Sequence, residues 1–335
     1  MKDTYYLFNP GRLSRRDNTL CFTPTDEQGQ ELAPKYIPVE GLQNLYVFGS
    51  LDANSALYNF LGKQRISVHF FDYYEHYCGS FQPKEYLLAG KMQVEQTRTY
   101  LNKTRRLHLA QGFVDGAGAN MLRNLKYYAG RGRALETHIE AIEKYRDGIA
   151  GVGSVPELMG LEGNCRQVYY AAFDHILNEF EMGGRSKQPP GNELNALVSF
   201  GNMLCYTQAL DAIYHTQLNP TISFLHEPGA RRYSLALDLA EIFKPILTDR
   251  TIFSLVNKRA LQQKHFDNAL NGCFLNNSGK QIFLRAFEER LDETIQHRSL
   301  NKKVSYKYLI RLECYKLSKY ILKMESAYKP FKIWW

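Results

Sequence analysis

Hydrophobic positions follow different patterns in the two parts of the chain. Up to about residue 82, apolar residues occur in short runs close to Gly, Pro, Asn or Asp, which is typical of short β-strands. This pattern predicts strands over residues 5–8, 19–23, 36–39, 45–48 and 66–71, and one short helix over residues 54–61. The first part of the chain is therefore predicted to be a small β-rich domain.

From about residue 91 onward, apolar residues recur at the 3.6-residue spacing of amphipathic helices. Helices are predicted over residues 91–110, 117–129, 134–147, 156–182, 191–217, 234–244, 255–270, 279–297 and 304–324. The glycines between residues 112 and 118 are interpreted as a break between helices, and residues 221–225 as a strand. The sequence thus predicts an α+β protein, with a small β-rich domain at residues 1–90 and a larger all-helical domain at residues 91–335.

The chain of 335 residues has a formal net charge of +8, concentrated in its later part. Residues 1–90 contain 8 Lys or Arg and 10 Asp or Glu, whereas residues 298–335 contain 10 basic and 2 acidic residues. Two basic zones lie in the predicted helical domain: Arg98, Lys103, Arg105, Arg106, Arg123, Lys126, Arg131 and Arg133, and then Lys302, Lys303, Lys307, Arg311, Lys316, Lys319 and Lys323. This distribution indicates a polyanionic partner such as nucleic acid, although a solvated lysine-rich surface would give the same pattern.

Aromatic residues add two observations. The adjacent pairs Tyr127-Tyr128 and Tyr169-Tyr170 lie in predicted helices, where they could stack on splayed bases, but their apolar neighbours favour a place in the core. The aromatic segment at residues 331–335 is expected either to dock on a partner or to fold back on its own domain. The sequence does not distinguish these two arrangements.

Several classes of protein are excluded by the composition. No run approaches the roughly 18–20 apolar residues of a membrane span, and the N-terminus lacks the apolar run of a secretory signal. The six cysteines are dispersed, which argues against a zinc ribbon or a redox pair and favours reduced thiols in a cytoplasmic protein. Neither the P-loop nor the dinucleotide-binding glycine pattern is present in the sequence.

The first candidate site residue is Glu162, beside the apolar face of the helix predicted over residues 156–182. Gly160 and Gly163 flank it, and each glycine costs about 1 kcal/mol relative to alanine inside a helix. Such glycines indicate that another group approaches the backbone closely. The alternative is a surface glutamate between two glycines that serve helix packing.

A second cluster begins at His226, which ends the predicted strand. A Pro-Gly turn with Arg231 and Arg232 follows, and the next helix is apolar almost all round, as is typical of a buried helix. This helix nevertheless contains Asp238 and Glu241 on one face. Because burying an unpaired carboxylate is costly, a cation must compensate, either one of the two arginines or a metal ion.

A metal ion is the favoured explanation. His226 and Glu162, with either Asp238 or Glu241, would offer one nitrogen and several oxygen ligands, a mixture that suits Mn²⁺ or Mg²⁺. Zinc fits less well, because Cys165 is the only cysteine near these positions. In a basic protein, such a metal would neutralise a phosphodiester and activate an attacking oxygen, while Lys and Arg hold the DNA backbone.

Several segments resemble, in order along the chain, the motifs of the CRISPR-associated spacer-acquisition integrase family, the nuclease of the adaptation machinery. They are residues 160–166, 195–201 and 225–241 in the helical part, and residues 9–20, 37–40, 45–49 and 68–74 in the β-rich part. Each motif alone is weakly specific. The combination of three helical motifs after a β-rich first part is specific, and it covers nearly the whole chain.

The resemblance implies a homodimer joined largely through the β-rich domains, and a helical catalytic domain. It also implies a complex in which two such dimers flank a dimer of a small ferredoxin-like adaptation protein. The implied reaction is a transesterification, in which the 3′-hydroxyl of a new spacer DNA attacks a phosphodiester at the end of a CRISPR repeat. The same site would hydrolyse DNA if water replaced that hydroxyl, so the protein is expected to be an integrase and endonuclease.

Site residues follow from the resemblance position by position. The family's metal ligands correspond to Glu162, His226 and Glu241. Many members have Asp at the third of these positions. Asp238 matches a second acid of the motif and is expected to orient the histidine or a metal-bound water. The candidates for contacts with DNA phosphates are Arg166, Arg231, Arg232 and Lys244.

Two other functions stay open on the sequence. One is a stand-alone metal nuclease for branched or single-stranded DNA, which would shorten DNA rather than join it. The other is a DNA-binding scaffold whose acids pair with Arg231 and Arg232, and which would show no stabilisation by Mn²⁺.

Overall fold

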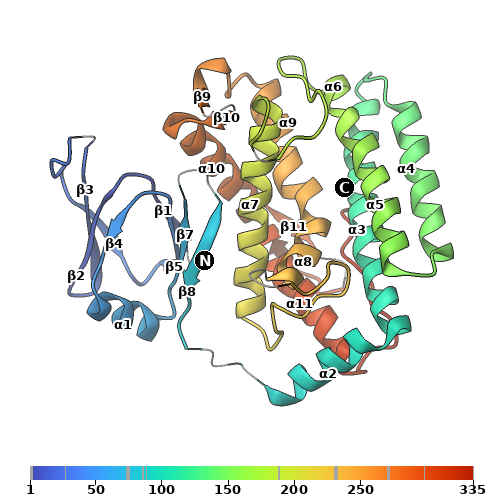
Figure 1. Cartoon of the computed structure of the whole chain (residues 1–335), viewed down its shortest axis with the longest axis horizontal. Helices are drawn as coiled ribbons and strands as arrows, with labels where there is room; N and C mark the ends of the chain where they lie inside the picture. The colour runs from blue at the N-terminus through green and yellow to red at the C-terminus, as the bar shows by residue number, and fades with distance from the viewer. Residues whose placement is uncertain are drawn as a thin grey trace. The chain divides into compact units, whose positions relative to one another are not determined.

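The computed structural model describes residues 3–26, 28–72, 76–84, 87, 89–187, 189–229, 233–269, 272–297 and 299–334 (Figure 1). The chain forms two compact units, Met1–Tyr86 and Leu87–Trp335. Strands dominate the first unit and helices the second, so the predicted α+β class is confirmed. Within the described residues, no helix is long and apolar enough to cross a membrane.

The first unit contains two four-stranded sheets and one helix. One sheet has the strand order β1–β5–β7–β8, and the other has the order β4–β3–β2–β6. The strands are β1 (Asp3–Leu7), β2 (Gly11–Arg16), β3 (Thr19–Pro24), β4 (Lys35–Pro38), β5 (Leu42–Val47), β6 (Leu51–Asp52), β7 (Ser67–Phe71) and β8 (Tyr77–Phe81). Helix α1 (Ser55–Gln64) begins after Asn54, whose side chain accepts a hydrogen bond from the N–H of Leu57 and caps the helix.

The predicted strands overlap β1, β3, β4, β5 and β7. Strand β2 has no signal in the hydrophobic pattern, because its arginines are exposed and Leu13 is its one buried apolar side chain. It is formed by antiparallel pairing with β3, in which Leu13 lies opposite Phe22. Neighbouring strands, rather than alternation within the segment, therefore determine its structure.

The second unit is a helical bundle with two short antiparallel hairpins. Its helices are α2 (Gly90–Leu101), α3 (Lys103–Ala129), α4 (Glu136–Gly148), α5 (Val155–Ala171), α6 (Phe173–Ile176), α7 (Glu193–Tyr214), α8 (Ser234–Lys244), α9 (Arg250–Asn257), α10 (Asn277–Asp292) and α11 (Tyr306–Ile321). Two 3₁₀ turns, η1 (Ile149–Gly151) and η3 (Gln263–His265), and the π-helical turn η2 (Pro245–Asp249) connect them. The hairpins pair β9 (Phe266–Ala269) with β10 (Gly272–Leu275), and β11 (Thr294–Gln296) with β12 (Lys303–Ser305).

Helix α8 is buried between α3 and α7, as its apolar sequence predicts. Pro245 follows it directly and has no N–H, so the regular ladder of helical hydrogen bonds is interrupted there. Two buried amides of α3 bond to carbonyls around this interruption: Asn120 donates to Ile242 at 2.9 Å and Asn124 donates to Pro245 at 2.7 Å. The π-helical turn is thus held from outside by side chains.

Several element predictions for this unit are wrong. Residues 266–269 and 294–296, which were predicted as the ends of helices, form strands β9 and β11. Residues 221–225 form no strand, and Phe224 and Leu225 are buried in an irregular loop instead. Helix α3 also runs without a break through Gly112 and Gly116. A Cβ atom at Gly112 would lie 2.7 Å from the Tyr328 ring, and one at Gly116 would lie 2.8 Å from Pro330. These glycines therefore make room for the C-terminal tail rather than end a helix.

The C-terminal tail folds back on the helical unit. Asn120 of α3 accepts a hydrogen bond from the N–H of Ile333 at 2.8 Å, and the Tyr328 hydroxyl donates to the buried carboxylate of Glu313 on α11. Phe331 stacks on Phe243 of α8, with ring centroids 5.6 Å apart. Of the two arrangements that the sequence left open, the structure shows the second.

Candidate active site

A cavity of about 730 Å³ in the helical unit brings together most of the predicted site residues. Glu162 and Arg166 enter it from α5, Glu241 and Lys244 from α8, and His226 from the loop before α8. Its other described walls include Tyr170, Asp174, Arg185, Lys187 and Asn202. Glu162 and Glu241, which are 79 positions apart in the sequence, therefore line the same cavity.

A chain of ion pairs links the acids of the cavity. Arg166 donates to Glu162 through Nε at 2.7 Å, and its second guanidinium nitrogen contacts Glu241. Lys244 Nζ donates to the other carboxylate oxygen of Glu241 at 2.6 Å. Two cations thus compensate the buried acid of α8, and both come from the predicted DNA-contacting set.

This arrangement sets the charge states of its members. Burial favours the neutral form of Glu241, but the charges of Arg166 and Lys244 outweigh that effect and hold the pKa of this carboxyl well below its ordinary value. Burial likewise opposes the charge of Arg166, whereas Glu241 and Glu162 raise its pKa well above the ordinary range. The carboxylate of Glu241 and the guanidinium of Arg166 therefore both stay ionised at neutral pH.

Asp238 fixes the position of His226 from behind. Its carboxylate, with 0 % exposure, accepts the backbone N–H groups of Phe224 at 2.6 Å, Leu225 at 2.9 Å and His226 at 2.9 Å. It also bonds to His226 Nδ1 at 2.8 Å. Burial lowers the pKa of His226, but the hydrogen bond and charge of Asp238 raise it by more, so the net shift is upward.

These bonds explain why residues 221–225 are not a strand. The backbone donors at the end of this segment point to a carboxylate on α8 instead of to a neighbouring strand. The same bonds leave Nε2 as the ring nitrogen of His226 that is available to a ligand in the cavity. Asp238 itself is not among the residues that line the cavity.

The other predicted residues have mixed outcomes. Arg231 and Arg232 lie outside the described residues, so the predicted ion pairs with them have no structural test. Within the first basic zone, Arg105 donates to the carbonyls of Tyr320 and Ile321, and Arg106 donates to that of Phe224. Both side chains hold the helical unit together.

Tyr169 is fully buried, as its apolar neighbours predict.

Sequence reasoning missed two residues near the cavity. Arg185 follows a pair of glycines and is held by Asn195 and Ser199 of α7, each at 2.9 Å. The only signal for it in the sequence is a basic residue directly after Gly183 and Gly184. Asp249 lies in η2 with 2 % exposure, and burial raises its pKa to about 7 although Arg166 and Tyr169 counteract the shift.

The residues fit a divalent cation in chemistry but are not arranged as a preformed site. In the described ranges, no group of three His, Cys, Asp or Glu side chains converges on one point, and Arg166 bridges the two glutamates. Glu162, Glu241 and the free ring nitrogen of His226 nevertheless face one cavity and supply the oxygen-rich donor set that Mg²⁺ or Mn²⁺ prefers. A metal and the Arg166 guanidinium are thus alternative ways to neutralise the same carboxylates.

The chain thus combines a β-rich unit with a helical unit whose cavity is lined by Glu162, His226 and Glu241, and comparison with known proteins identifies its family. The family model described as "CRISPR associated protein Cas1" matches residues 5–289. "CRISPR-associated endonuclease Cas1 2" of Moorella thermoacetica is 46% identical over 332 residues, which cover 99% of each chain. The chain therefore belongs to the Cas1 family.

Two solved structures support the same conclusion at the level of the fold. A CAS1 protein from Thermotoga maritima has a TM-score of 0.86 and 38% identity, covering 97% of this chain and 98% of its own. A casposase bound to its integration product has a TM-score of 0.82 at 19% identity, covering 100% of this chain and 95% of its own. The predicted family and the predicted function, a CRISPR adaptation integrase with endonuclease chemistry, are confirmed.

Proposed function

We propose that the cavity formed by α5, α8 and the His226 loop is the site where spacer DNA is joined to the CRISPR repeat. Glu162, His226 and Glu241 would hold one Mn²⁺ or Mg²⁺, which neutralises charge on the phosphodiester and lowers the pKa of the attacking 3′-hydroxyl when bound. The observation that carries the proposal is that these three side chains, far apart in sequence, line one cavity.

The protein's own residues position the reactants. Asp238 holds Nδ1 of His226, so that Nε2 faces the cavity in a fixed orientation. Lys244 and Arg166 place positive charge beside Glu241, where a phosphodiester oxygen would need it. Arg185 and Lys187, which also line the cavity, extend this charge, and Arg231 and Arg232 remain proposed contacts on sequence grounds.

The test is Glu162→Gln in the full-length protein. The amide keeps the shape of the side chain and removes its charge, so integration of a fluorescent duplex into a repeat-bearing plasmid should fall by at least about 100-fold, a loss typical of an essential catalytic charge. Binding of the same duplex, measured by anisotropy, should change less than about threefold, because a single charge is removed from a basic surface.

Glu157→Gln is the matched control. It makes the same chemical change in the first turn of the same helix, where the carboxylate accepts from the N–H of Gly153 and does not line the cavity. Integration at the wild-type rate by the Glu162 variant would refute the site assignment. Shortened products without joined ones, from the wild type, would instead favour the stand-alone nuclease.

Metal dependence has its own readout. If the glutamates hold a divalent cation, Mn²⁺ should raise the melting temperature of the wild type, and Glu241→Gln should abolish that rise. Equal behaviour of the two proteins would favour a scaffold whose acids serve only the ion pairs with Arg166 and Lys244.

The assembly follows from the same proposal. We infer a homodimer joined through the β-rich unit, associated with a small ferredoxin-like adaptation protein and with DNA, as the family resemblance implies. The near-neutral composition of residues 1–90 suits a dimerising domain, and the basic remainder suits DNA. The reaction is placed in the cytoplasm, where the CRISPR DNA lies.

A further inference from the structure

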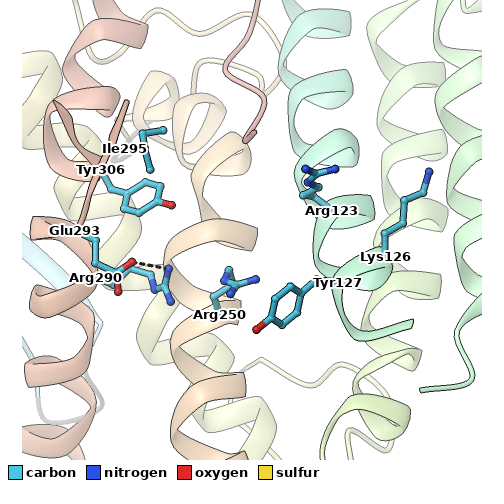
Figure 2. A pocket seen from close by; sticks show the side chains of 8 residues that line it. All are labelled: Arg123, Lys126, Tyr127, Arg250, Arg290, Glu293, Ile295 and Tyr306. Atoms are coloured by element: carbon cyan, nitrogen blue, oxygen red, sulfur yellow. Dashed lines mark hydrogen bonds and ion pairs between the residues drawn. The ribbon is translucent and has the colours of Figure 1, made fainter. Parts of the chain in front are cut away.

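A second cavity, of about 590 Å³, lies in the helical unit and shares no described lining residue with the catalytic cavity. It is lined by Arg123, Lys126, Tyr127, Arg250, Arg290, Glu293, Ile295 and Tyr306. Figure 2 shows Arg123 and Lys126 reaching the hollow from α3 on one side and Arg290 from α10 on the other, with Arg250 of α9 between them. The volume is in the range of small-molecule binding sites.

The lining is strongly cationic. Four of its described side chains are basic, and Glu293 is the one acid among them. Lys126 lies at the exposed rim and pairs with Glu143 of α4 at 2.6 Å, whereas Arg290 pairs with Glu293 at 3.1 Å. Even with both carboxylates counted, positive charges outnumber negative ones around this hollow.

The guanidinium groups of Arg290 and Arg250 repel each other, and Arg290 is largely buried. Only 14% of the Arg290 side chain is exposed, and burial lowers its pKa. Glu293 counteracts this effect, but the positive charge of Arg250 lowers the pKa of Arg290 further. An anion bound between the two arginines would offset that repulsion, because it would place negative charge beside both guanidinium groups.

The position of Arg250 is preorganised. Its guanidinium carbon lies 4.7 Å from the centroid of the Tyr127 ring, and that of Arg131 lies 3.9 Å from the same centroid. Such cation–π contacts hold the plane of a guanidinium group against the aromatic ring. Tyr306, 2 % exposed, supplies a second aromatic wall.

We propose that this cavity binds the phosphate of a nucleotide, with Arg250 and Arg290 as the principal ligands. A terminal phosphate carries close to two negative charges and three acceptor oxygens, which match two planar guanidinium forks better than a single carboxylate does. Tyr127 and Tyr306 form the aromatic part of the cavity wall beside these two arginines. The site is separate from the metal chemistry proposed above and does not depend on it.

The nucleotide has two possible sources, a free nucleotide or the phosphorylated end of a DNA strand. Titration calorimetry of the full-length protein in EDTA, with inorganic pyrophosphate, thymidine triphosphate and 5′-phosphorylated hexathymidylate as probes, separates them. EDTA prevents binding through a metal in the catalytic cavity. Tighter binding of the triphosphate than of the oligonucleotide assigns the site to free nucleotides, and the reverse order assigns it to strand ends.

Variants connect the binding to these residues. Arg290→Gln and Arg250→Gln should each weaken pyrophosphate binding about tenfold or more, since each removes a charge-assisted hydrogen bond. Glu293→Gln, at an exposed position, should tighten binding a few-fold because it removes the opposing charge. Arg285→Gln is the matched control, because it removes a cation from the same helix at a side chain that is 85% exposed and pairs with Glu289.

The Glu293 variant keeps the proposal testable even if an arginine variant fails to fold, which circular dichroism would reveal. Failure of the wild type to bind any of the three probes would overturn the proposal. Equal affinity for pyrophosphate in the wild type, Arg290→Gln and Glu293→Gln would also overturn it. Since none of these readouts involves integration, their failure would leave the catalytic assignment untouched.

Discussion

Asp249 makes the stability of this protein depend on pH in a direction opposite to that of most carboxylates. It is 2 % exposed in η2, and its Oδ1 atom has no hydrogen-bond partner among the described residues. Burial raises its pKa to about 7, against the charges of Arg166 and Lys244 and a hydrogen bond from Tyr169. The Tyr169 hydroxyl is free to donate because Asn124 donates to its oxygen at 2.9 Å.

The sign and size of the effect follow from proton linkage. In the unfolded chain this carboxyl ionises near its ordinary pKa of 3.8, whereas in the folded protein it stays protonated up to about pH 7. Between these values the folded state binds more protons, so the stability contributed by protonated Asp249 is full below pH 3.8 and is lost as pH rises to 7. A shift of about 3 units at about 1.4 kcal/mol per unit amounts to about 4 kcal/mol.

Asp249→Asn isolates this effect, because asparagine resembles the protonated acid and does not titrate. The free energy of unfolding of the variant minus that of the wild type should increase by about 4 kcal/mol between pH 4 and pH 8. Burying the amide N–H groups costs about 1–3 kcal/mol, but that cost is the same at every pH. Urea denaturation in EDTA at several pH values measures the difference directly.

The control is Asp147→Asn, which makes the same chemical change at an exposed position of α4. It should alter the free energy of unfolding by less than about 0.5 kcal/mol, as is usual for surface positions. If the pH profiles of wild type and Asp249→Asn run parallel, the carboxyl is ionised in the folded protein at neutral pH, and the reasoning from burial is refuted.

Two further substitutions test the supports of the site. Asp238→Asn removes the charge that raises the pKa of His226, so a ¹H–¹⁵N titration of that imidazole should show a lower pKa. Integration should also fall at least about tenfold, because the ring of His226 is no longer held in its orientation. An unchanged pKa of His226 would contradict this role of Asp238. Asn120→Ala leaves the Ile242 carbonyl and the Ile333 N–H without their buried partner. The free energy of unfolding, measured by urea denaturation, should therefore fall by about 2–4 kcal/mol. A loss below about 1 kcal/mol would mean that this side chain does not hold the tail.

The hydrophobic pattern predicts a helix well where the helix's own residues determine which of its sides are buried. Helices α4, α7, α8 and α11 begin and end within about three residues of their predicted positions. Helices α4 and α11 have an apolar face, whereas α7 and α8 are buried almost all round. Helix α3 was divided wrongly because the reason for its glycines lies more than 200 residues away, in Tyr328 and Pro330 of the tail. A local pattern cannot contain that information.

The candidate site shows the same limit. Two acids on an apolar helix indicated a compensating cation, and that inference needed only the cost of burying charge. Which cation compensates could not be inferred from the sequence: it offered Arg231, Arg232 or a metal ion, yet Lys244 and Arg166, the latter 75 residues from Glu241, make the contacts in the described structure. Helix packing determines such pairs, and a single sequence does not specify it.

The π-helical turn gives the consecutive residues Thr248, Asp249 and Arg250 different surroundings. In a regular helix, the face that carries Glu241 and Lys244 would continue at residue 248, but the wider turn after Pro245 delays that face by one residue. Asp249 therefore lies near Arg166 and Lys244, whereas Thr248 faces α7 and donates to the Gly201 carbonyl at 2.9 Å. A Cβ atom at residue 201 would lie 2.4 Å from the Thr248 side chain, so glycine is required there. Arg250, the residue directly after this turn, lines the second cavity.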